Sequence, residues 1–442
     1  MQILIIGDTL SACALAQQLT EEQHSVRIIG MHSARLQALQ QYADLEVIQQ
    51  DPNNAQSYYP LQQELFNTII CLQQDDCHNL VSAQLASHIL QPEVIICSLH
   101  HHDPVLASLL RQATVNSVIF SPHELCAQAL TALLHYPGCL EVIRLSNYPV
   151  VHTRIQPQST FIANTCAQIN QYSPTWQVLA HHRDGEILDI DHHNLIEAGD
   201  DIIIALYTNK HSLYQQLNPG LKAYRDIIIA GSSDISIQFI ERLPRHCHAK
   251  IINANPKHNQ HIAQTFPQHT ILQGNINDTA LLLHENIANA QAFFALSNDD
   301  EDNLVSALQA KNLQAHLVAS LVNRPSLVPI VEQSKIDIAL SPQRIITDTI
   351  FRYVHRQNVH AAHALQQHCG EIIEINIDKT LAQRQLNHIS LPKHCHWFGL
   401  QRHGKISAMN PQTTLQQGDQ CSLYISQASD VNGIIEQLYP ND

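Results

Sequence analysis

The pattern of apolar and polar positions divides the chain into short strands separated by longer amphipathic helices. Apolar runs at residues 3–6 and 227–230 each lead into a glycine, Gly7 in one case and Gly231 in the other. Apolar residues then recur at helical spacing, at Leu15 and Leu19 after the first glycine and at Ile235, Phe239 and Leu243 after the second. A strand, a glycine turn and a helix are therefore predicted at both places.

Further strand-length apolar runs follow each of these beginnings, with helical patterns between them. They lie at residues 26–29, 68–72, 94–97 and 117–120, and again at 249–252, 292–296, 317–321 and 336–340. Strands that alternate with helices are typical of a parallel, doubly wound sheet. We therefore predict a Rossmann-like domain at residues 1–135 and a second one at residues 225–355.

A different pattern closes each half of the chain. Runs at 177–180 and 186–190 flank Asp184-Gly185, a strong hairpin signal, and His403-Gly404 holds the same place later. Two more strands are predicted, at 201–207 after Gly199-Asp200 and at 421–425 after Gly418-Asp419. We therefore predict a small α+β domain at residues 136–218 and another at 362–442. The fold class is α/β, with two tandem Rossmann-like sheets, each followed by such a domain.

Constant offsets between matching residues indicate that the chain is a tandem duplication. Gly7, Asp75-Asp76 and the NLVSA run at 79–83 reappear 224 positions later, at Gly231, Asp299-Asp300 and 303–307. Arg183, Gly185 and Gly199-Asp200 reappear 219 positions later, at Arg402, Gly404 and Gly418-Asp419. Offsets that persist over distant points mark a repeated unit.

Charge and cysteine usage exclude several classes of protein. The formal net charge is -15, and no run of Lys and Arg is present, which disfavours nucleic acid or an anionic membrane surface as a partner. The eleven cysteines form no C-x-x-C pair, so we expect buried, reduced thiols. Charged residues make up only 14% of the chain, and we expect Gln and His to fill the surface in their place.

The start of the chain reads as a strand and not as a signal peptide. It lacks a basic segment and reaches Asp8 after a short apolar run. Apolar runs elsewhere are also of strand length, well short of the roughly 20 residues of a membrane helix. A cytoplasmic protein is predicted, with any membrane role exercised through a partner.

Several short segments carry a resemblance to a known family. They are Ser297-Asn298-Asp299-Asp300-Glu301 with Asn303, Ser341-Pro342-Gln343, Ser121-Pro122-His123-Glu124-Leu125, Tyr136-Pro137-Gly138, and the pairs Gly199-Asp200 and Gly418-Asp419. With the repeated two-part layout, they make essentially the whole chain resemble the TrkA-like family, whose members carry tandem RCK (KTN) domains.

The resemblance implies a regulatory role. Such proteins are homo-oligomers, a dimer or tetramer ring, at the inner face of the membrane beneath a TrkH- or TrkG-like potassium translocator. They bias its gating in response to a nucleotide, NAD(H) or an adenine nucleotide such as ATP or ADP.

The first candidate nucleotide site departs from the usual dinucleotide pattern. That pattern needs a glycine-rich turn at a helix N-terminus and an acidic residue for the ribose. The loop residues are Gly7, Asp8, Thr9, Leu10 and Ser11, with Thr9 in place of the second glycine and Ala12 in place of the third. The ribose position is Gly30, the third-strand turn contributes Asp51, and Gln73 and Gln74 follow the strand at 68–72.

The second candidate site keeps only the first glycine. Its loop residues are Gly231, Ser232, Ser233, Asp234 and Ile235, and its ribose position is Asn253. The third-strand turn contributes Gly274 and Asn275, and Ser297 and Asn298 end the strand at 292–296. Two interpretations stay open for each cleft: weak binding of a nucleotide through the backbone, or a relic loop on an intact scaffold that has lost its ligand.

Two other groups of residues invite a chemical role. Asp75-Asp76 and Asp299-Asp300 could serve as paired carboxylates, but their position at a helix start favours capping. The tracts at His100-His101-His102, at 246–248 and at 394–396 could suggest a metal site. Neighbouring residues of an extended segment point to opposite faces, so surface positions are favoured and no metal site is predicted. A pH-sensing role of the histidines remains a hypothesis.

Three classes of function remain for comparison. A non-enzymatic regulatory subunit is favoured, because no nucleophile or base constellation accompanies either cleft. A structural ring without nucleotide control is the main alternative. A NAD-dependent oxidoreductase is the third.

Overall fold

The computed structural model describes the whole chain apart from a few short segments. These are residues 32–33, 43, 101–103, 114–115, 146, 189, 191–192, 209–216, 355–358, 366–368, 393, 427–430 and 440–442. The chain forms two compact units, residues 1–127 with 322–326 and 341–350, and residues 128–321 with 327–340 and 351–442. None of the helices in the described part of the chain has both the length and the apolar character needed to cross a bilayer.

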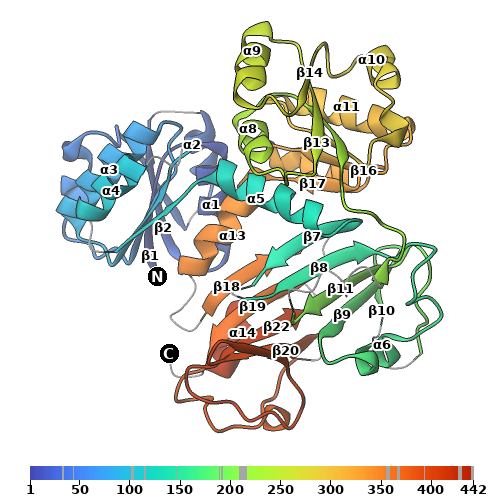
Figure 1. Cartoon of the computed structure of the whole chain (residues 1–442). Helices are drawn as coiled ribbons and strands as arrows, with labels where there is room; N and C mark the ends of the chain where they lie inside the picture. Colours follow the sequence, from blue (N-terminus) through green and yellow to red (C-terminus); the bar gives the residue numbers. More distant parts are fainter. Residues whose placement is uncertain are drawn as a thin grey trace. The chain divides into compact units, whose positions relative to one another are not determined.

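The first unit contains a six-stranded parallel sheet with helices packed on it (Figure 1). The strand order is β3-β2-β1-β4-β5-β6, so the direction of winding reverses between β1 and β4. The elements are β1 (Gln2–Ile6), α1 (Leu10–Glu21), β2 (Ser25–Gly30), α2 (Ala34–Leu39), β3 (Leu45–Gln49), β4 (Thr68–Cys71), α3 (Asp76–Leu90), β5 (Val94–Ser98), α4 (Pro104–Ala113) and β6 (Ser117–Phe120). Helix α5 (Pro122–His135) begins in this unit, and its residues after Ala127 belong to the second unit.

The second unit contains another parallel sheet of the same order, β14-β13-β12-β15-β16-β17. Its elements are β12 (Asp226–Ala230), α8 (Asp234–Glu241), β13 (His248–Asn253), α9 (Pro256–Thr265), β14 (Thr270–Gln273), α10 (Thr279–His284), β15 (Ala292–Ala295), α11 (Asp300–Asn312), β16 (Leu317–Leu321), α12 (Val328–Glu332), β17 (Ile338–Leu340) and α13 (Pro342–Val354). Most of α13 belongs to the first unit, whereas the sheet belongs to the second.

Two small lobes built on antiparallel sheets complete the second unit. The first lobe contains β7 (Cys139–Arg144), β8 (Pro149–Arg154), α6 (Cys166–Tyr172), β9 (Trp176–Arg183), β10 (Glu186–Leu188) and β11 (Asp201–Leu206). The second lobe contains β18 (Val359–Ala364), β19 (Glu371–Asn376), β20 (Cys395–Arg402), β21 (Lys405–Ala408), β22 (Gln420–Ile425) and α14 (Val431–Leu438). The predicted fold class, two Rossmann-like sheets with two α+β domains, is confirmed.

The same ion pair, between a half-buried arginine and a buried aspartate, occurs in both small lobes. Arg183 donates from Nε and Nη2 to the Asp200 carboxylate, and Arg402 donates in the same way to Asp419. Burial alone would raise the pKa of Asp200. Hydrogen bonds from Arg183, the Glu197 N–H and His181 outweigh burial and lower this pKa to about 2. The Gly-Asp pairs recognised in the sequence therefore place the carboxylate that holds each lobe together.

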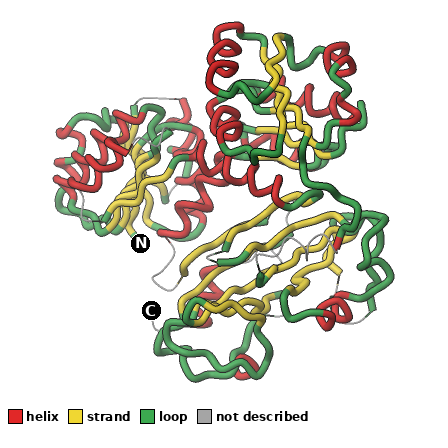
Figure 2. Tube along the Cα trace, viewed as in Figure 1, coloured by secondary structure: helices red, strands yellow, loops and turns green. Residues whose placement is uncertain are grey.

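The two lobes pack against each other through one apolar cluster. Figure 2 shows the strands of the two lobes as neighbours. Tyr148 of the first lobe donates a hydrogen bond to Ser422 Oγ of the second, at 2.6 Å. Its hydroxyl fills the space above Gly399, where an added Cβ would overlap it. Tyr207 also crosses the boundary and donates to the Phe398 carbonyl, at 2.7 Å. The lobes therefore share this core, and the second lobe also has a core of its own that includes Ile373 and Leu423.

Some predicted boundaries were wrong for local reasons. Helix α8 ends at Glu241, so Leu243 lies outside it, because Pro244 disfavours helical backbone at the preceding residue. Strand β17 starts at Ile338 and not at residue 336, because the Asp337 carboxylate accepts from Val318 N and Lys311 Nζ in the preceding loop.

The small lobes brought further boundary corrections. Strand β9 runs to Arg183 and not to residue 180, because its last residues bind Asp200. Strand β10 ends at Leu188 and not at residue 190.

The expected placement of histidines and cysteines was also partly wrong. His152, His181 and His182 are buried in the first small lobe, contrary to the surface role predicted for histidine. All cysteines are free thiols, and all are buried except Cys77, which is exposed on α3. Burial of these side chains costs solvation, which raises the pKa of Cys13 to about 11 and lowers the pKa of His182.

Candidate functional site

The predicted site residues meet at the carboxyl edge of each parallel sheet. In the first sheet, Gly7 N donates to Ile29 O at 2.8 Å, and Gln50 N donates to Gly30 O at 3.0 Å. The loop after β1, the end of β2 and the turn after β3 are therefore adjacent, as they are in the second sheet, where Gly231 N donates to Ile252 O. This edge, at the point where the strand order reverses, is where doubly wound sheets bind ligands.

The glycine kept in each loop is required by the scaffold itself. Gly7 has φ +132°, and an added Cβ would lie 2.6 Å from Leu72 O. Gly231 has φ +106°, and its Cβ would lie 2.5 Å from Ser297 N. Any side chain would collide with the neighbouring strand end, so these two glycines are needed whether or not a nucleotide binds.

Thr9 and Ser233, which replace the middle glycine, are helix caps. Thr9 Oγ1 accepts from Ala12 N at 3.2 Å and donates to Leu72 O at 2.8 Å. Ser233 Oγ accepts from Ser236 N at 3.3 Å in the same way. Each hydroxyl therefore satisfies one of the free N–H groups of the first helical turn, which a bound phosphate would otherwise approach.

The remaining first-turn amides differ little between the copies. The backbone N–H groups of Leu10 and Ser11 make no hydrogen bond within the described residues, and neither do those of Asp234 and Ile235. Two N–H donors therefore remain at each helix start for an anionic group. In the second copy the Asp234 side chain lies in this turn, where its charge stabilises the helix but repels phosphate.

The ribose positions are occupied in two different ways. A Cβ at Gly30 would lie 3.2 Å from Asp8 Cβ, so the loop brings the base of the Asp8 side chain next to the place where an acidic residue is missing. In the second copy, Asn253 Nδ2 donates to Asn259 Oδ1 at 3.0 Å, and Asn259 Nδ2 donates back to Asn253 O. The Asn253 side chain is thus already hydrogen-bonded to Asn259 of α9, the helix that follows its strand.

The turns after the third strand stabilise themselves. Asp51 Oδ1 accepts from Asn53 N at 2.9 Å, and Asn275 Oδ1 accepts from Asn277 N at 2.9 Å. Gly274 sits beside Leu281, whose Cδ2 would lie 2.5 Å from an added Cβ. In each turn, the polar side chain therefore accepts a hydrogen bond from a backbone N–H of the same turn.

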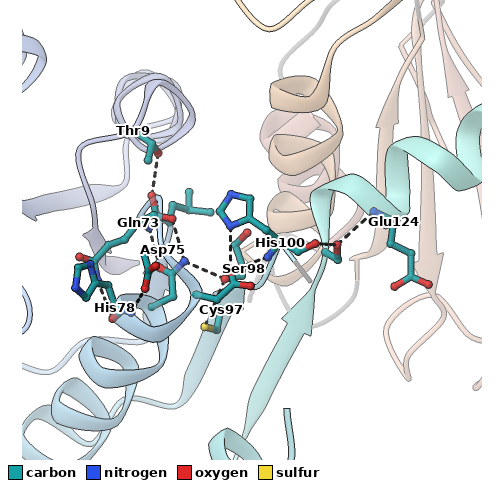
Figure 3. A network of polar contacts seen from close by, with 12 residues as sticks. Thr9, Gln73, Asp75, His78, Cys97, Ser98, His100 and Glu124 are labelled. Atoms are coloured by element: carbon teal, nitrogen blue, oxygen red, sulfur yellow. Dashed lines mark hydrogen bonds and ion pairs between the residues drawn. The ribbon is translucent and has the colours of Figure 1, made fainter. Parts of the chain in front are cut away.

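At the end of the central strand, Gln73 belongs to a polar network (Figure 3). Its Nε2 donates to His78 O and to Ser82 Oγ, both at 2.9 Å, so the carboxamide is held on α3. Gln74 is exposed at the mouth of the cleft. In the second copy Ser297 Oγ donates to Asp299 O at 3.0 Å, and Asn298 is exposed.

An asparagine that was not among the predicted site residues fixes each of these strand ends. Asn79 Oδ1 accepts from Gln73 N at 2.7 Å, and its Nδ2 donates to Gln73 O and Ser98 O. Asn303 makes the equivalent bonds to Ser297 and to Leu321 O. Both side chains are fully buried. The repeated NLVSA run was the signal, since it contains each asparagine.

A basic residue on the helix after the second strand was also missed. Arg35 Nη1 donates to Asp8 O at 3.3 Å, and His258 Nδ1 lies 3.2 Å from Ser232 Oγ. Each contact is made with the second residue of the glycine loop. The two positions differ by 223, close to the offset of the duplication, so self-comparison could have found them. A cationic side chain thus lies beside the glycine loop of the first sheet.

The paired aspartates cap helices, as predicted. Asp75 and Asp299 are the N-caps of α3 and α11 and accept from His78 N and Asp302 N. Asp76 has a further role, because its Oδ1 accepts from His100 N at 2.7 Å and lies 2.9 Å from His100 Nδ1. His101 and His102 lie outside the described residues. Within the described residues, no three His, Cys, Asp or Glu side chains form a group that could hold a metal ion.

Solved structures share this architecture. The crystal structure of the GsuK RCK domain superposes with a TM-score of 0.63 and 15% identity, covering 100% of this chain and 95% of that one. The GsuK channel bound to NAD gives a TM-score of 0.62 and 15% identity, covering 100% and 79%. These similarities show the fold.

Sequence comparisons agree over the full length. The Trk system potassium uptake protein TrkA of Haemophilus influenzae is 24% identical over 454 aligned positions, covering 100% of this chain and 99% of that protein. The TrkA homolog of Archaeoglobus fulgidus is 22% identical, covering 96% and 97%. The model of the TrkA-N domain matches residues 3–121 and 227–342, the two parallel sheets. Since these matches together span more than half of its residues, the chain belongs to the TrkA-N domain family.

Proposed function

We propose that this chain is the regulatory subunit of a Trk-type potassium uptake system and biases the gating of a TrkH- or TrkG-like translocator in response to a nucleotide. The observation that carries the proposal is full-length similarity to TrkA proteins, together with two intact TrkA-N domains in one chain. The same proposal places the protein in the cytoplasm, at the membrane only through its partner, as a homo-oligomer.

The first cleft is the better candidate for the nucleotide. Arg35 provides a cation beside the loop, and the N–H groups of Leu10 and Ser11 provide donors for a phosphate. Asp8 lies beside Gly30, where a ribose hydroxyl would need an acceptor. An adenine nucleotide such as ATP or ADP, or NAD(H), has the groups that these residues recognise. One structural relative, the GsuK channel, has been solved with NAD bound to it.

The second cleft is a weaker candidate because its side chains already bind each other. Asn253 is paired with Asn259, and Ser232 lies against His258. A ligand would have to replace these contacts. The duplicated chain would then carry one cleft that responds to a nucleotide and one that has only a structural role. For the second cleft, the alternative of a structural ring without nucleotide control would then hold.

A regulatory role fits the chemistry of both clefts better than an oxidoreductase does. The buried Cys13 thiol on α1 has a pKa raised to about 11, so it is not a nucleophile at neutral pH. A nucleotide bound there would act by its different affinity for two states of the subunit, not by turnover.

Growth and copurification test the proposal. A strain lacking this chain should grow poorly at low potassium and recover on its return, and the tagged chain should copurify with a TrkH-like membrane protein. Calorimetry with ATP, ADP and NADH should give binding to the purified chain without consumption of NADH. Normal growth of the deletion strain at limiting potassium would contradict the regulatory role, and steady NADH turnover would favour the enzyme.

A further inference from the structure

A cavity of about 320 Å³ lies within the second unit, away from both nucleotide clefts. Its walls come from three segments: the first small lobe with Leu140 and Arg154, the connector between the halves with Leu221 and Lys222, and the second Rossmann sheet with His316 and Asp337. His316 and Asp337 directly precede β16 and β17, so the cavity lies at the amino edge of that sheet. The candidate nucleotide cleft lies at the carboxyl edge.

The connector that forms one wall is a fixed part of the structure. Tyr224 is buried, and its hydroxyl accepts from Gly138 N at 3.1 Å. Gly138 has φ +85°, and an added Cβ would lie 2.5 Å from Leu221 Cδ1, so the connector packs closely on the first lobe. Asn218 is also buried and bonds to Thr153. The cavity is therefore bounded by ordered chain on all three sides.

Among the described residues around the cavity, one lysine makes no ion pair. Asp337 is neutralised by Lys311 at 2.5 Å and also accepts from Val318 N. Arg154 is held by Asp201 through two hydrogen bonds, at 2.8 and 2.9 Å. Lys222 is exposed and makes no ion pair within the described part of the chain. A ligand that met these walls would find a single uncompensated positive charge.

The size and the lining indicate what the ligand would be. Small-molecule sites usually occupy about 300 to 1,000 Å³ and combine an apolar lining with a few polar groups. Leu140, Leu221 and Leu317 give this cavity apolar walls, and Gln156 adds an amide next to the cationic side. An organic body with one anionic group matches this lining better than an inorganic ion or a neutral compound.

We propose that this cavity binds a small organic anion, a carboxylate or a phosphate ester with an apolar body. Because its walls belong to the first lobe, the connector and the second Rossmann domain, the bound anion would stabilise them as one piece. Occupancy would therefore raise the thermal stability of the second unit as ligand concentration rises. The site is separate from the nucleotide cleft, and the proposal does not depend on the regulatory function.

Titration of the full chain with two probes tests the proposal. Benzoate and phenyl phosphate carry the two kinds of anionic group on the same ring, and calorimetry with each identifies the preferred group. At least one of them should bind with a Kd below about 5 mM. Inorganic phosphate and phenol, which supply the charge or the ring alone, should bind more weakly. Saturating ATP should not compete.

Variants place the binding in this cavity. Lys222→Gln should weaken the better probe about fivefold, as expected for the loss of an exposed charge pair. Lys405→Gln, which removes an exposed lysine of the second lobe, should leave binding unchanged. Leu221→Trp should abolish binding by filling the space, and an unchanged circular dichroism spectrum with cooperative unfolding is the folding control, because the larger side chain also presses on Gly138. No binding of either probe, or binding that both cavity variants leave unchanged, would overturn the proposal.

Discussion

The two small lobes share an ion pair, but the surfaces through which they meet differ. Arg183 with Asp200 and Arg402 with Asp419 have the same geometry, down to the two donors of each guanidinium. Within one lobe, this pair joins the end of β9 or β20 to the loop that directly precedes β11 or β22. It is present in both lobes and makes the same hydrogen bonds in each.

The residues at the boundary between the lobes have changed in size. At the offset of 219, Ala180 of the first lobe corresponds to Gly399 of the second, and Ala205 corresponds to Tyr424. All but Gly399 belong to the cluster that joins the lobes, and Gly399 receives the Tyr148 hydroxyl. The comparison indicates that duplicated positions diverge where two copies must fit each other and stay constant where each copy supports itself.

The largest difference between the lobes should appear when the ion pair is broken. Within the described part of the chain, Asp419 would keep the Gln416 N–H as its one remaining donor, so Arg402→Gln should lower the free energy of unfolding by about 3 kcal/mol. Arg183→Gln should cost clearly less, because His181 still lies 2.6 Å from Asp200. Urea unfolding can be followed by tryptophan fluorescence, since the lobes contain Trp176 and Trp397.

The histidine itself provides the control for this comparison. His181→Leu copies Leu400, the residue at the same place in the second lobe. The double variant Arg183→Gln/His181→Leu should lose as much free energy of unfolding as Arg402→Gln does. Equal costs of the two arginine variants in the parent chain would contradict the comparison.

A smaller loss is expected at the boundary. Gly399→Ala places a methyl group against the Tyr148 hydroxyl and should cost about 2 kcal/mol, as overpacking does in well-packed cores. Tyr148→Phe removes that hydroxyl, so Gly399→Ala should cost less in the Tyr148→Phe background. The same cost in both backgrounds would show that the two residues are not coupled.

A smaller effect is expected when the two clefts are compared by their affinity for ATP. Arg35→Gln should weaken ATP binding about fivefold, which corresponds to about 1 kcal/mol for an exposed charge. His258→Gln, the matched change in the second copy, should have little effect if the first cleft holds the nucleotide. Calorimetry with ATP measures both. A loss with His258→Gln and none with Arg35→Gln would assign the ligand to the other cleft.

The smallest effect concerns pH. Burial lowers the pKa of His182 below its ordinary value of 6.5. The charge of Asp201 raises this pKa, and His181 lowers it further, but burial has the largest effect. The folded state therefore prefers neutral His182, and its contribution to stability is complete above pH 6.5 and is lost as the pH falls below that value.

A substitution taken from the other lobe isolates this effect. His182→Gln copies Gln401, and it should reduce the loss of melting temperature between pH 7.5 and pH 5.5. An unchanged pH dependence in this variant would place the titration elsewhere.

Much of the fold could be predicted from the sequence because its signals are local or repeated. Strand runs, the hairpin turns at Asp184 and His403, and the duplication itself each depend on neighbouring residues or on a constant offset. Both hairpins formed, with positive φ at the first turn residue. The helix caps at Asp75 and Asp299 were predicted for the same reason, since a cap is set by the residues of one helical turn.

The rest depends on contacts between distant segments. The Tyr148 hydroxyl and Gly399 are 251 positions apart, and neither residue has an unusual neighbourhood in the sequence. Thr9 could be recognised as a replaced glycine, but its cap hydrogen bond to Ala12 follows from backbone geometry. The approach of Asp8 to Gly30 likewise results from strand pairing, so it could not be read from either residue alone.

The contact between the Tyr148 hydroxyl and Gly399 determines whether one half of the chain can be stable without the other. Each half has a complete set of sheets, yet a fragment ending near residue 218 would expose Tyr148 and its apolar neighbours Ile143, Leu179 and Ile203. Apolar patches of this kind promote aggregation. Another copy of the same fragment would not cover it, because Ala180 stands where the glycine is needed. The two halves are therefore no longer interchangeable, and each depends on the other to cover this part of its core.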